Sequence, residues 1–548
     1  MPTRRTFLRR AAGAAALWTL GCRTVPRPGD ATAPGAEPWR AELAARPFPL
    51  AEATVADLQA AMASGARTSR GLVELYLARI AQLDRQGPRL HAVLETNPDA
   101  LAIADQLDAE RRARGPRGPL HGIPVLLKDN IDTADRMSTT AGSVVLEGSR
   151  PPRDATIVQR LRAAGAVILG KTNLSEWANF RSTRSVSGWS GRGGQCRNPY
   201  ALDRSPCGSS SGSGAAVAAN LCAVAVGTET DGSIVCPSAV SGLVGLKPTV
   251  GLVSRAGIIP IAASQDTAGP MCRTVADAAA LLTALVGADP RDPRDPATAA
   301  AVGRVADYAA ALDAGGLRGA RLGVVRKSFG YHPELDALVD SALAVMKAQG
   351  AELVDPVDLS SMGELGADEL EVLLYEFKDG LNAYLASLGP AAPVRSLAEL
   401  IEANRKLADR ELPLFGQELF ERAQQKGPLT DPAYREALAR NLRAARADGI
   451  DAIMDRHRLD ALVAPTNGPA WLIDAVNGDH FIGGSTAAAA IAGYPSLTVP
   501  VGQVRGLPVG ASLFGRAFSE ATLLRLAYAY EQASHARRPP TFPASVVL

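Results

Sequence analysis

Aromatic residues, long apolar runs and charge of one sign are all scarce in this 548-residue sequence. Aromatic side chains make up only 5% of the chain, against 52 glycines and 38 prolines, so we expect an Ala/Val/Leu core with many tight turns. No apolar run reaches the ~18 residues of a membrane span. The formal net charge is +2, and four arginines lie within the first ten residues, so the remainder has no basic stripe. Nucleic-acid binding is therefore not expected.

The N-terminus has the pattern of an export signal. Arg4-Arg5 precede Phe7-Leu8 and a short apolar stretch that ends at Gly21, too short to span a bilayer but suited to a signal peptide. We interpret residues 1–22 as a twin-arginine signal for a protein that is exported folded, to the periplasm or the extracellular space. An amphipathic helix is the alternative. The sequence before Cys22 resembles an imperfect lipoprotein cleavage site, which leaves a lipid anchor open. Residues 23–45 are predicted to be a flexible, Pro-rich tether.

The six cysteines do not have the spacing of a metal site. None forms a CxxC pair, so no zinc site is expected. Five of them follow residue 22, an odd number, and a chain that folds before export does so in a reducing cytosol. We therefore predict no required disulfide framework. The cysteines are Cys22, Cys196, Cys207, Cys222, Cys236 and Cys272.

The body alternates between apolar runs bounded by glycines and helical stretches, which predicts an α/β fold. Residues 54–85 have the apolar spacing of two helices. Residues 300–460 are richer in charge and in helical period, and we interpret them as a helical insertion that shapes a pocket. Strands are expected at Pro124–Leu127, Ala166–Leu169, Ala223–Val226, Ala461–Ala464, Ser496–Val501 and Val509–Phe514, and a helix at Ala215–Leu221.

The Gly/Ser-rich stretch at residues 208–214 is the strongest candidate for chemistry, with a flexible linker as the plain alternative. Its G-x-S-x-G pattern would make Ser210 the nucleophile of an α/β-hydrolase-like esterase, but residues 204–207 make a poor preceding strand, and the histidines lack a clear motif. A second serine-bearing turn follows at Thr228–Ile234. Two such turns flanking one helix–strand unit could converge, so that a serine attacks a carbonyl while backbone N–H groups stabilise the oxyanion.

Several motifs in order resemble the amidase signature family over residues 50–540. That resemblance implies one amidase domain, with a mixed central sheet covered by helices and a helical insertion in its second half. It also implies a serine amidohydrolase that needs no metal or cofactor and cleaves carboxamides to acid and ammonia through an acyl-enzyme. The motifs are Gly122–Asp129, Gly170–Asn173, Gly208–Gly212, Asp231–Ile234, Gly245–Thr249 and Pro495–Pro500.

The same resemblance implies a Ser-Ser-Lys triad. Ser233 would be the nucleophile, Ser209, expected after a cis peptide bond, the proton shuttle, and Lys128 the general base. Composition alone does not separate this lysine from Lys171 and Lys247, which occupy similar strand-end positions. A useful base must be neutral near pH 7, which burial in the apolar stretch before residue 128 would favour. The oxyanion hole would consist of the backbone amides of Thr230, Asp231, Gly232 and Ser233.

Departures from the family pattern refine the expected substrate. Cys207 and Ser211 replace signature-loop glycines, and Glu229 and Asp231 stand where Asp and Gly are usual. The stretch Glu229–Ser233, together with Ser264–Pro270, is similar to the peptide amidase branch, which favours a peptide C-terminal amide or another small amide as substrate. Val235 replaces a frequent arginine, which weakens the alternative of a glutaminase-type amidotransferase subunit. An exported binding protein with an inactive site is a further alternative, and the oligomeric state is not predicted.

Overall fold

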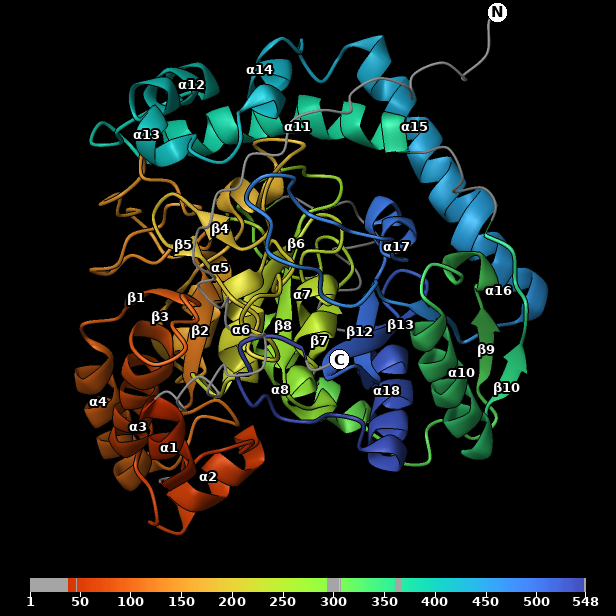
Figure 1. Ribbon diagram of the computed structural model, residues 1–548, viewed down its shortest axis with the longest axis horizontal. Helices are drawn as coiled ribbons and strands as arrows, with labels where there is room; N and C mark the ends of the chain where they lie inside the picture. Colours follow the sequence, from red (N-terminus) through yellow and green to blue (C-terminus); the bar gives the residue numbers. More distant parts are fainter. Residues whose placement is uncertain (1–37, 46, 293–304, 306, 360–365, 547–548) are drawn as a thin grey trace, which may run out of the picture. The chain divides into compact units, whose positions relative to one another are not determined.

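The computed structural model describes residues 38–45, 47–292, 305, 307–359 and 366–546 (Figure 1). The predicted signal peptide with Cys22 and the first part of the tether lie outside these residues. The last part of the tether is not a flexible linker, because Pro38–Ala45 forms helix α1. Proline suits the first turn of a helix, and the alanines, leucine and glutamate that follow favour its continuation. Residues 1–47 form a unit separate from residues 48–548. None of the described helices is long and apolar enough to cross a membrane.

The larger unit is built on one mixed sheet of 11 described strands, as the family resemblance implied. Parallel pairing joins β2 to β3 and β6, and joins β9 to β10 and β11. The other neighbours are antiparallel. From edge to edge the strands are β1 (Val93–Thr96), β3 (Val167–Thr172), β2 (Pro124–Lys128), β6 (Val224–Glu229), β8 (Thr267–Cys272), β7 (Val244–Lys247), β12 (Ser496–Val504), β13 (Leu507–Phe514), β11 (Ala461–Pro465), β9 (Arg321–Val324) and β10 (Glu352–Val354).

Helices cover both sides of this sheet, which explains why its central strands are apolar on both faces. Every residue of β2, β3 and β6 is buried. Parallel strands enclosed in this way have continuous apolar sequences rather than alternating ones. The covering and leading helices are α2 (Val55–Ala63), α3 (Ser69–Ile80), α4 (Ala100–Arg114), α5 (Thr156–Ala163), α6 (Ser211–Ala218), α7 (Val235–Val240), α8 (Val275–Leu285), α10 (Pro333–Ala348), α17 (Ala487–Ala492) and α18 (Glu520–Ser534).

The predicted strands and leading helices are confirmed to within a few residues, but the region 300–460 is not wholly helical. It contains the edge strands β9 and β10, so the chain returns to the sheet before residue 461. These strands have only four and three described residues, too few to show a period in the sequence. A small second sheet pairs β4 (Trp189–Ser190) with β5 (Gly194–Gln195).

The helices of the insertion that follow α10 pack beside the segment that follows β3. Phe377 and Leu381 share one buried apolar cluster with Trp177 and Phe180. Figure 1 shows these helices beyond one end of the strands, in green-blue to blue. They are α11 (Gly366–Ser387), α12 (Leu397–Lys406), α13 (Ala408–Glu411), α14 (Glu418–Gln424), α15 (Pro432–Ala445) and α16 (Asp451–His457).

Candidate active site

Lys128 ends strand β2 and directs its amine at the Gly/Ser-rich loop. The side chain is fully buried. Its Nζ donates hydrogen bonds to Ser209 Oγ (2.7 Å), Thr228 Oγ1 (2.8 Å) and Thr228 O (3.2 Å). Asn130 Nδ2 also donates to Thr228 Oγ1 (3.0 Å), so this hydroxyl is held from two sides. The predicted base, Lys128, and the predicted shuttle, Ser209, are therefore in direct contact, and Thr228 holds the lysine amine in place.

The two other candidate lysines are equally buried, but their amines bond elsewhere. Lys171 Nζ donates to Ile131 O (2.6 Å) and Thr139 Oγ1 (2.8 Å). Lys247 Nζ donates to Pro248 O (3.4 Å), a contact with its own chain neighbour. Of these three lysines, only Lys128 is recorded with a bond to a serine of either candidate turn. Burial does not distinguish the three lysines from one another. The strand on which each one stands does, because it decides which segments the amine can reach.

Burial makes the ammonium form of Lys128 a stronger acid, with its pKa lowered from the ordinary 10.5 to about 7. The main cause is loss of hydration of the ammonium form, opposed by the negative charges of Asp266 and Glu229. The neighbouring Asp129 does not supply a counter-charge to this amine. Its carboxylate accepts from Thr140 and faces Arg192 (3.4 Å), as expected for residues on opposite faces of a strand.

The peptide bond between Gly208 and Ser209 is cis, as the family resemblance implied. Ser210, the candidate nucleophile of the esterase interpretation, is fully buried, and its Oγ donates to Thr228 O (3.0 Å). The structure assigns no strand to residues 204–209 before this serine, whereas a nucleophile elbow lies directly after one. The geometry therefore does not support an esterase that uses Ser210.

The second turn, residues 230–233, links β6 to α7 and carries the predicted nucleophile. Glu229 Oε2 accepts from the backbone N–H groups of Ile234 (2.7 Å) and Val235 (3.0 Å), which fixes the end of the turn. Gly232 has φ +76°, a left-handed conformation that favours glycine. The amide of Ser210 donates to Ser233 O (3.2 Å), so the two serine-bearing turns do converge.

The backbone amides of this turn are the predicted oxyanion hole. Among the described residues, no protein acceptor is recorded for the backbone N–H groups of residues 230–233. Ser233 lines a cavity of about 300 Å³, together with the turn itself. Ser209 and Thr228 line a second cavity of about 220 Å³. Ala178, Thr230 and Ile261 line both cavities, so the two spaces adjoin where the turns meet.

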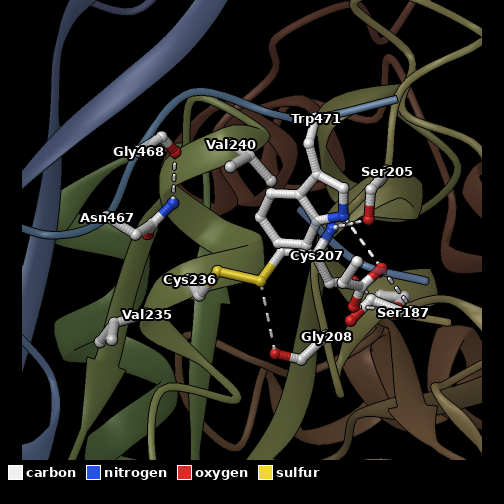
Figure 2. Close-up of a disulfide and its surroundings, with 12 residues drawn as sticks. Ser187, Ser205, Cys207, Gly208, Val235, Cys236, Val240, Asn467, Gly468 and Trp471 are labelled. Carbon is white, nitrogen blue, oxygen red and sulfur yellow. Dashed lines mark hydrogen bonds between the residues drawn. A yellow bond between two sulfur atoms is a disulfide. The ribbon is translucent and has the colours of Figure 1, made fainter. Parts of the chain in front are cut away.

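A disulfide joins the two turns, contrary to the prediction from cysteine number and compartment. Cys207 and Cys236 are bonded across 29 residues of sequence, with their Cα atoms 6.2 Å apart. The sequence argument failed because an odd count does not prevent one pair from forming where two segments converge. Figure 2 shows the bond beside the indole of Trp471, which belongs to the same buried apolar cluster. Cys196, Cys222 and Cys272 are free and buried.

Trp471 connects the disulfide to the rim of the larger cavity. Its Nε1 donates to Asp479 Oδ1 (2.9 Å), a carboxylate that also accepts from Ser187 N (3.1 Å). The indole meets Phe481 edge to face, with ring centroids 5.8 Å apart. Sequence reasoning missed this aromatic pair, which lies in a loop without a motif. It also missed Thr228 as a holder of the lysine, although this residue lies inside the quoted motif.

The described residues contain no group of three or more His, Cys, Asp or Glu side chains arranged to hold a metal ion.

Comparisons with known proteins agree with this geometry. The model of the amidase family matches residues 71–524. Native peptide amidase from Stenotrophomonas maltophilia is 57% identical, with a TM-score of 0.86 over 90% of this chain and 100% of that one. A complex of the peptide amidase PAM with the competitive inhibitor chymostatin is 58% identical, with a TM-score of 0.87 and the same coverage. A probable amidase of Arabidopsis thaliana is 43% identical over 506 residues, 91% of this chain and 93% of the relative.

Proposed function

Because the chain belongs to the amidase family and is a hydrolase of amide carbon–nitrogen bonds, we propose that it releases ammonia from peptide C-terminal amides through a Ser233–Ser209–Lys128 triad. The observation that carries this proposal is the contact of a fully buried lysine with Ser209 (2.7 Å), beside a turn whose amides lack a protein acceptor among the described residues. The similarity to peptide amidase supports the substrate class.

Lys128 acts as the base in its neutral form. A neutral amine has two N–H groups and one lone pair, and Thr228 offers two acceptors, its carbonyl and its hydroxyl oxygen. On loss of its third proton the amine no longer donates to Ser209 Oγ, and its lone pair accepts the hydroxyl proton of Ser209 instead. As Lys128 takes that proton, Ser209 takes the proton of Ser233, whose oxygen attacks the amide carbon.

The oxygen of the attacked carbonyl gains negative charge and is stabilised by the amides of Thr230, Asp231, Gly232 and Ser233. Because these donors are fixed before the reaction, they need little reorganisation in the transition state. The relay then runs backwards: Ser209 donates a proton to the nitrogen, the carbon–nitrogen bond breaks and ammonia leaves. Water hydrolyses the resulting acyl-enzyme by the same two proton transfers, which restores the free serine.

The shape and charge of the larger cavity support a peptide acyl group. Leu373, Trp471 and Phe481 present apolar surface to it, and Phe481 is 51% exposed at its rim. Val235, where an arginine is frequent in the family, is fully buried and offers no cation to a free carboxylate. A substrate with a blocked, uncharged terminus therefore suits this site better than free glutamine, a zwitterion that needs charged partners.

We also propose that the enzyme is exported in its folded state. Arg4-Arg5 and the apolar stretch after them support a twin-arginine address, and Cys22 is the residue that a lipid anchor would use. The enzyme would then act in the periplasm or outside the cell, where it meets peptides rather than transfer RNA.

A substrate profile tests this function. We expect kcat/KM for a blocked peptide amide to exceed that for glutamine by at least about a hundredfold, a difference of roughly 3 kcal/mol in transition-state binding. Ammonia release is measured for both compounds and for the matching peptide ester and aryl amide. Comparable kcat/KM values for glutamine and the peptide amide would refute the assignment. A fluorophosphonate should label Ser233, and peptide mapping distinguishes this serine from Ser210.

A further inference from the structure

Helix α11 of the insertion reaches the nucleophile-bearing turn through Glu369. The carboxyl groups of Glu369 and Asp231 lie close enough for each to shift the pKa of the other. Gln265 Nε2 bridges the same region, donating to Glu369 Oε1 (3.0 Å) and Thr230 O (3.4 Å). The insertion, the segment before β8 and the turn are thus connected next to the predicted oxyanion amides.

Contact between two carboxyl groups requires a proton. Asp231 Oδ1 is shielded from solvent, and no donor to it is recorded among the described residues. Thr486 lowers the pKa of Asp231, but Oδ1 of this carboxyl still has no donor. A buried acceptor without a donor destabilises the folded state. One proton held on Glu369 removes that cost and turns a repulsive pair into a hydrogen bond.

We propose that Glu369 is a positioning residue for amide hydrolysis: its protonated carboxyl donates a hydrogen bond to Asp231 and holds the turn of residues 230–233 in its catalytic geometry. The inference rests on the proposed function, because it takes Ser233 as the nucleophile and the amides of this turn as the oxyanion hole. Glu369 itself touches no reacting atom.

The electrostatic surroundings agree with a proton on this pair. Burial, and then the charge of Asp231, raise the pKa of Glu369 to about 8. Burial also raises the pKa of Asp231, although Lys247 on β7 favours its ionised form. Glu229 on β6 also lies near Asp231, and the charge of Asp231 helps to raise the pKa of Glu229. On α11 itself, Asp368 pairs with Arg440 and Glu371 with Lys426.

The sign of the pH effect follows from these contacts. Below about pH 8 the shared proton is present and the turn is held. Above that pH Glu369 ionises, the two carboxylates repel each other, and kcat falls. Because Lys128 must lose a proton for activity and the pair must keep one, the pH profile should be bell-shaped.

Two substitutions of Glu369 separate positioning from simple packing. E369Q keeps the shape and replaces the proton-dependent donor by an amide that cannot ionise, whereas E369A removes the donor. We expect E369A to lower kcat at least roughly tenfold, with KM changed less than about threefold, because misplaced donors act on the transition state. E369Q should retain more of kcat than E369A, and its alkaline limb should move up by at least about one pH unit. E371Q, two residues along the same helix, is the matched control and should keep the wild-type limb.

Two readouts keep the outcomes distinct. The pH dependence of kcat is measured on a blocked peptide amide, and fluorophosphonate labelling identifies the acylated serine in each variant. An alkaline limb in E369Q identical to that of the wild type, with the label on Ser233, would overturn the role of Glu369 alone. A label on another serine would overturn the proposed function instead. Circular dichroism shows whether E369A is folded. If it is not, the alkaline limb of the E369Q pH profile alone decides whether Glu369 positions the turn.

Discussion

Substitution of Lys128 by methionine gives a direct measure of how far the fold has altered its acidity. Methionine has a similar length and no ionisable group, so K128M removes the titration while it keeps an unbranched side chain in place. The loss of the lone pair should abolish the proton relay and collapse kcat. Lys171→Ala, which changes a lysine that bonds to Ile131 and Thr139 instead, is the control for a general effect of buried lysines on turnover.

The magnitude follows from the two pKa values of this amine. In the unfolded chain Lys128 keeps its proton up to about pH 10.5, whereas in the folded protein it loses the proton near a pKa of about 7. Between these values unfolding takes up one proton, so the free energy of unfolding rises by about 1.36 kcal/mol per pH unit as the pH increases. From pH 7.5 to 9.5 the wild type should gain about 2.5 kcal/mol relative to K128M, in which this titration is absent.

Denaturant unfolding of both proteins at pH 7.5, 8.5 and 9.5 measures that difference. Lys327→Met, at an exposed position, controls for the loss of one lysine. The kcat/KM profile of the wild type should rise through an apparent pKa near 7 that belongs to the coupled triad. The reasoning fails if the stability difference between wild type and K128M is constant over this range, or if K128M turns over amides at near-wild-type rates.

Three further outcomes follow from the sequence and the site. Replacement of Arg4 and Arg5 by lysine should leave precursor in the cytosol; mature enzyme in the envelope would contradict the export signal. Reduction of the Cys207–Cys236 bond, or its replacement by two alanines, should lower the free energy of unfolding by about 3–4 kcal/mol for a loop of 29 residues, as seen in denaturant titrations with and without reductant; identical midpoints would argue against this. Phe481→Ala should raise KM for a peptide amide about fivefold with kcat retained, and an unchanged KM would remove this ring from the binding surface.

The sheet could be predicted from sequence where strands are buried on both faces. Residues 124–127 and 461–464 are unbroken apolar runs, and both became strands. β9 and β10 were not predicted from the sequence, because short edge strands do not need unbroken apolar runs and because helical sequence follows each of them. β9 is placed by its pairing with β11, a contact between residues far apart in the chain that no local pattern records, and β10 is placed by its pairing with β9.

Some residues of the site could be predicted from local motifs, whereas others are placed there only by contacts between distant parts of the chain. Ser209, Ser233 and Lys128 each stand in a recognisable motif, so the resemblance could single them out. Thr228 holds the lysine across 100 residues of sequence, and Glu369 reaches Asp231 from the insertion, where the sequence has no motif. Interactions of this kind depend on which elements pack together, and a single sequence does not contain that information.

The positions at which this chain departs from the usual family pattern are structurally connected. Cys207, in place of a signature-loop glycine, bonds to Cys236, and its carbonyl accepts from Ser211 Oγ (2.6 Å), the second departure in that loop. Asp231, in place of another glycine, has a carboxyl that must be satisfied, and Glu369 is in contact with it. Cys207 and Asp231 each add a side chain whose partner is also present, so either one introduced alone would leave an unpaired thiol or carboxylate beside the nucleophile. The pattern is therefore best understood as a set of coupled substitutions that stabilise the two catalytic turns against each other.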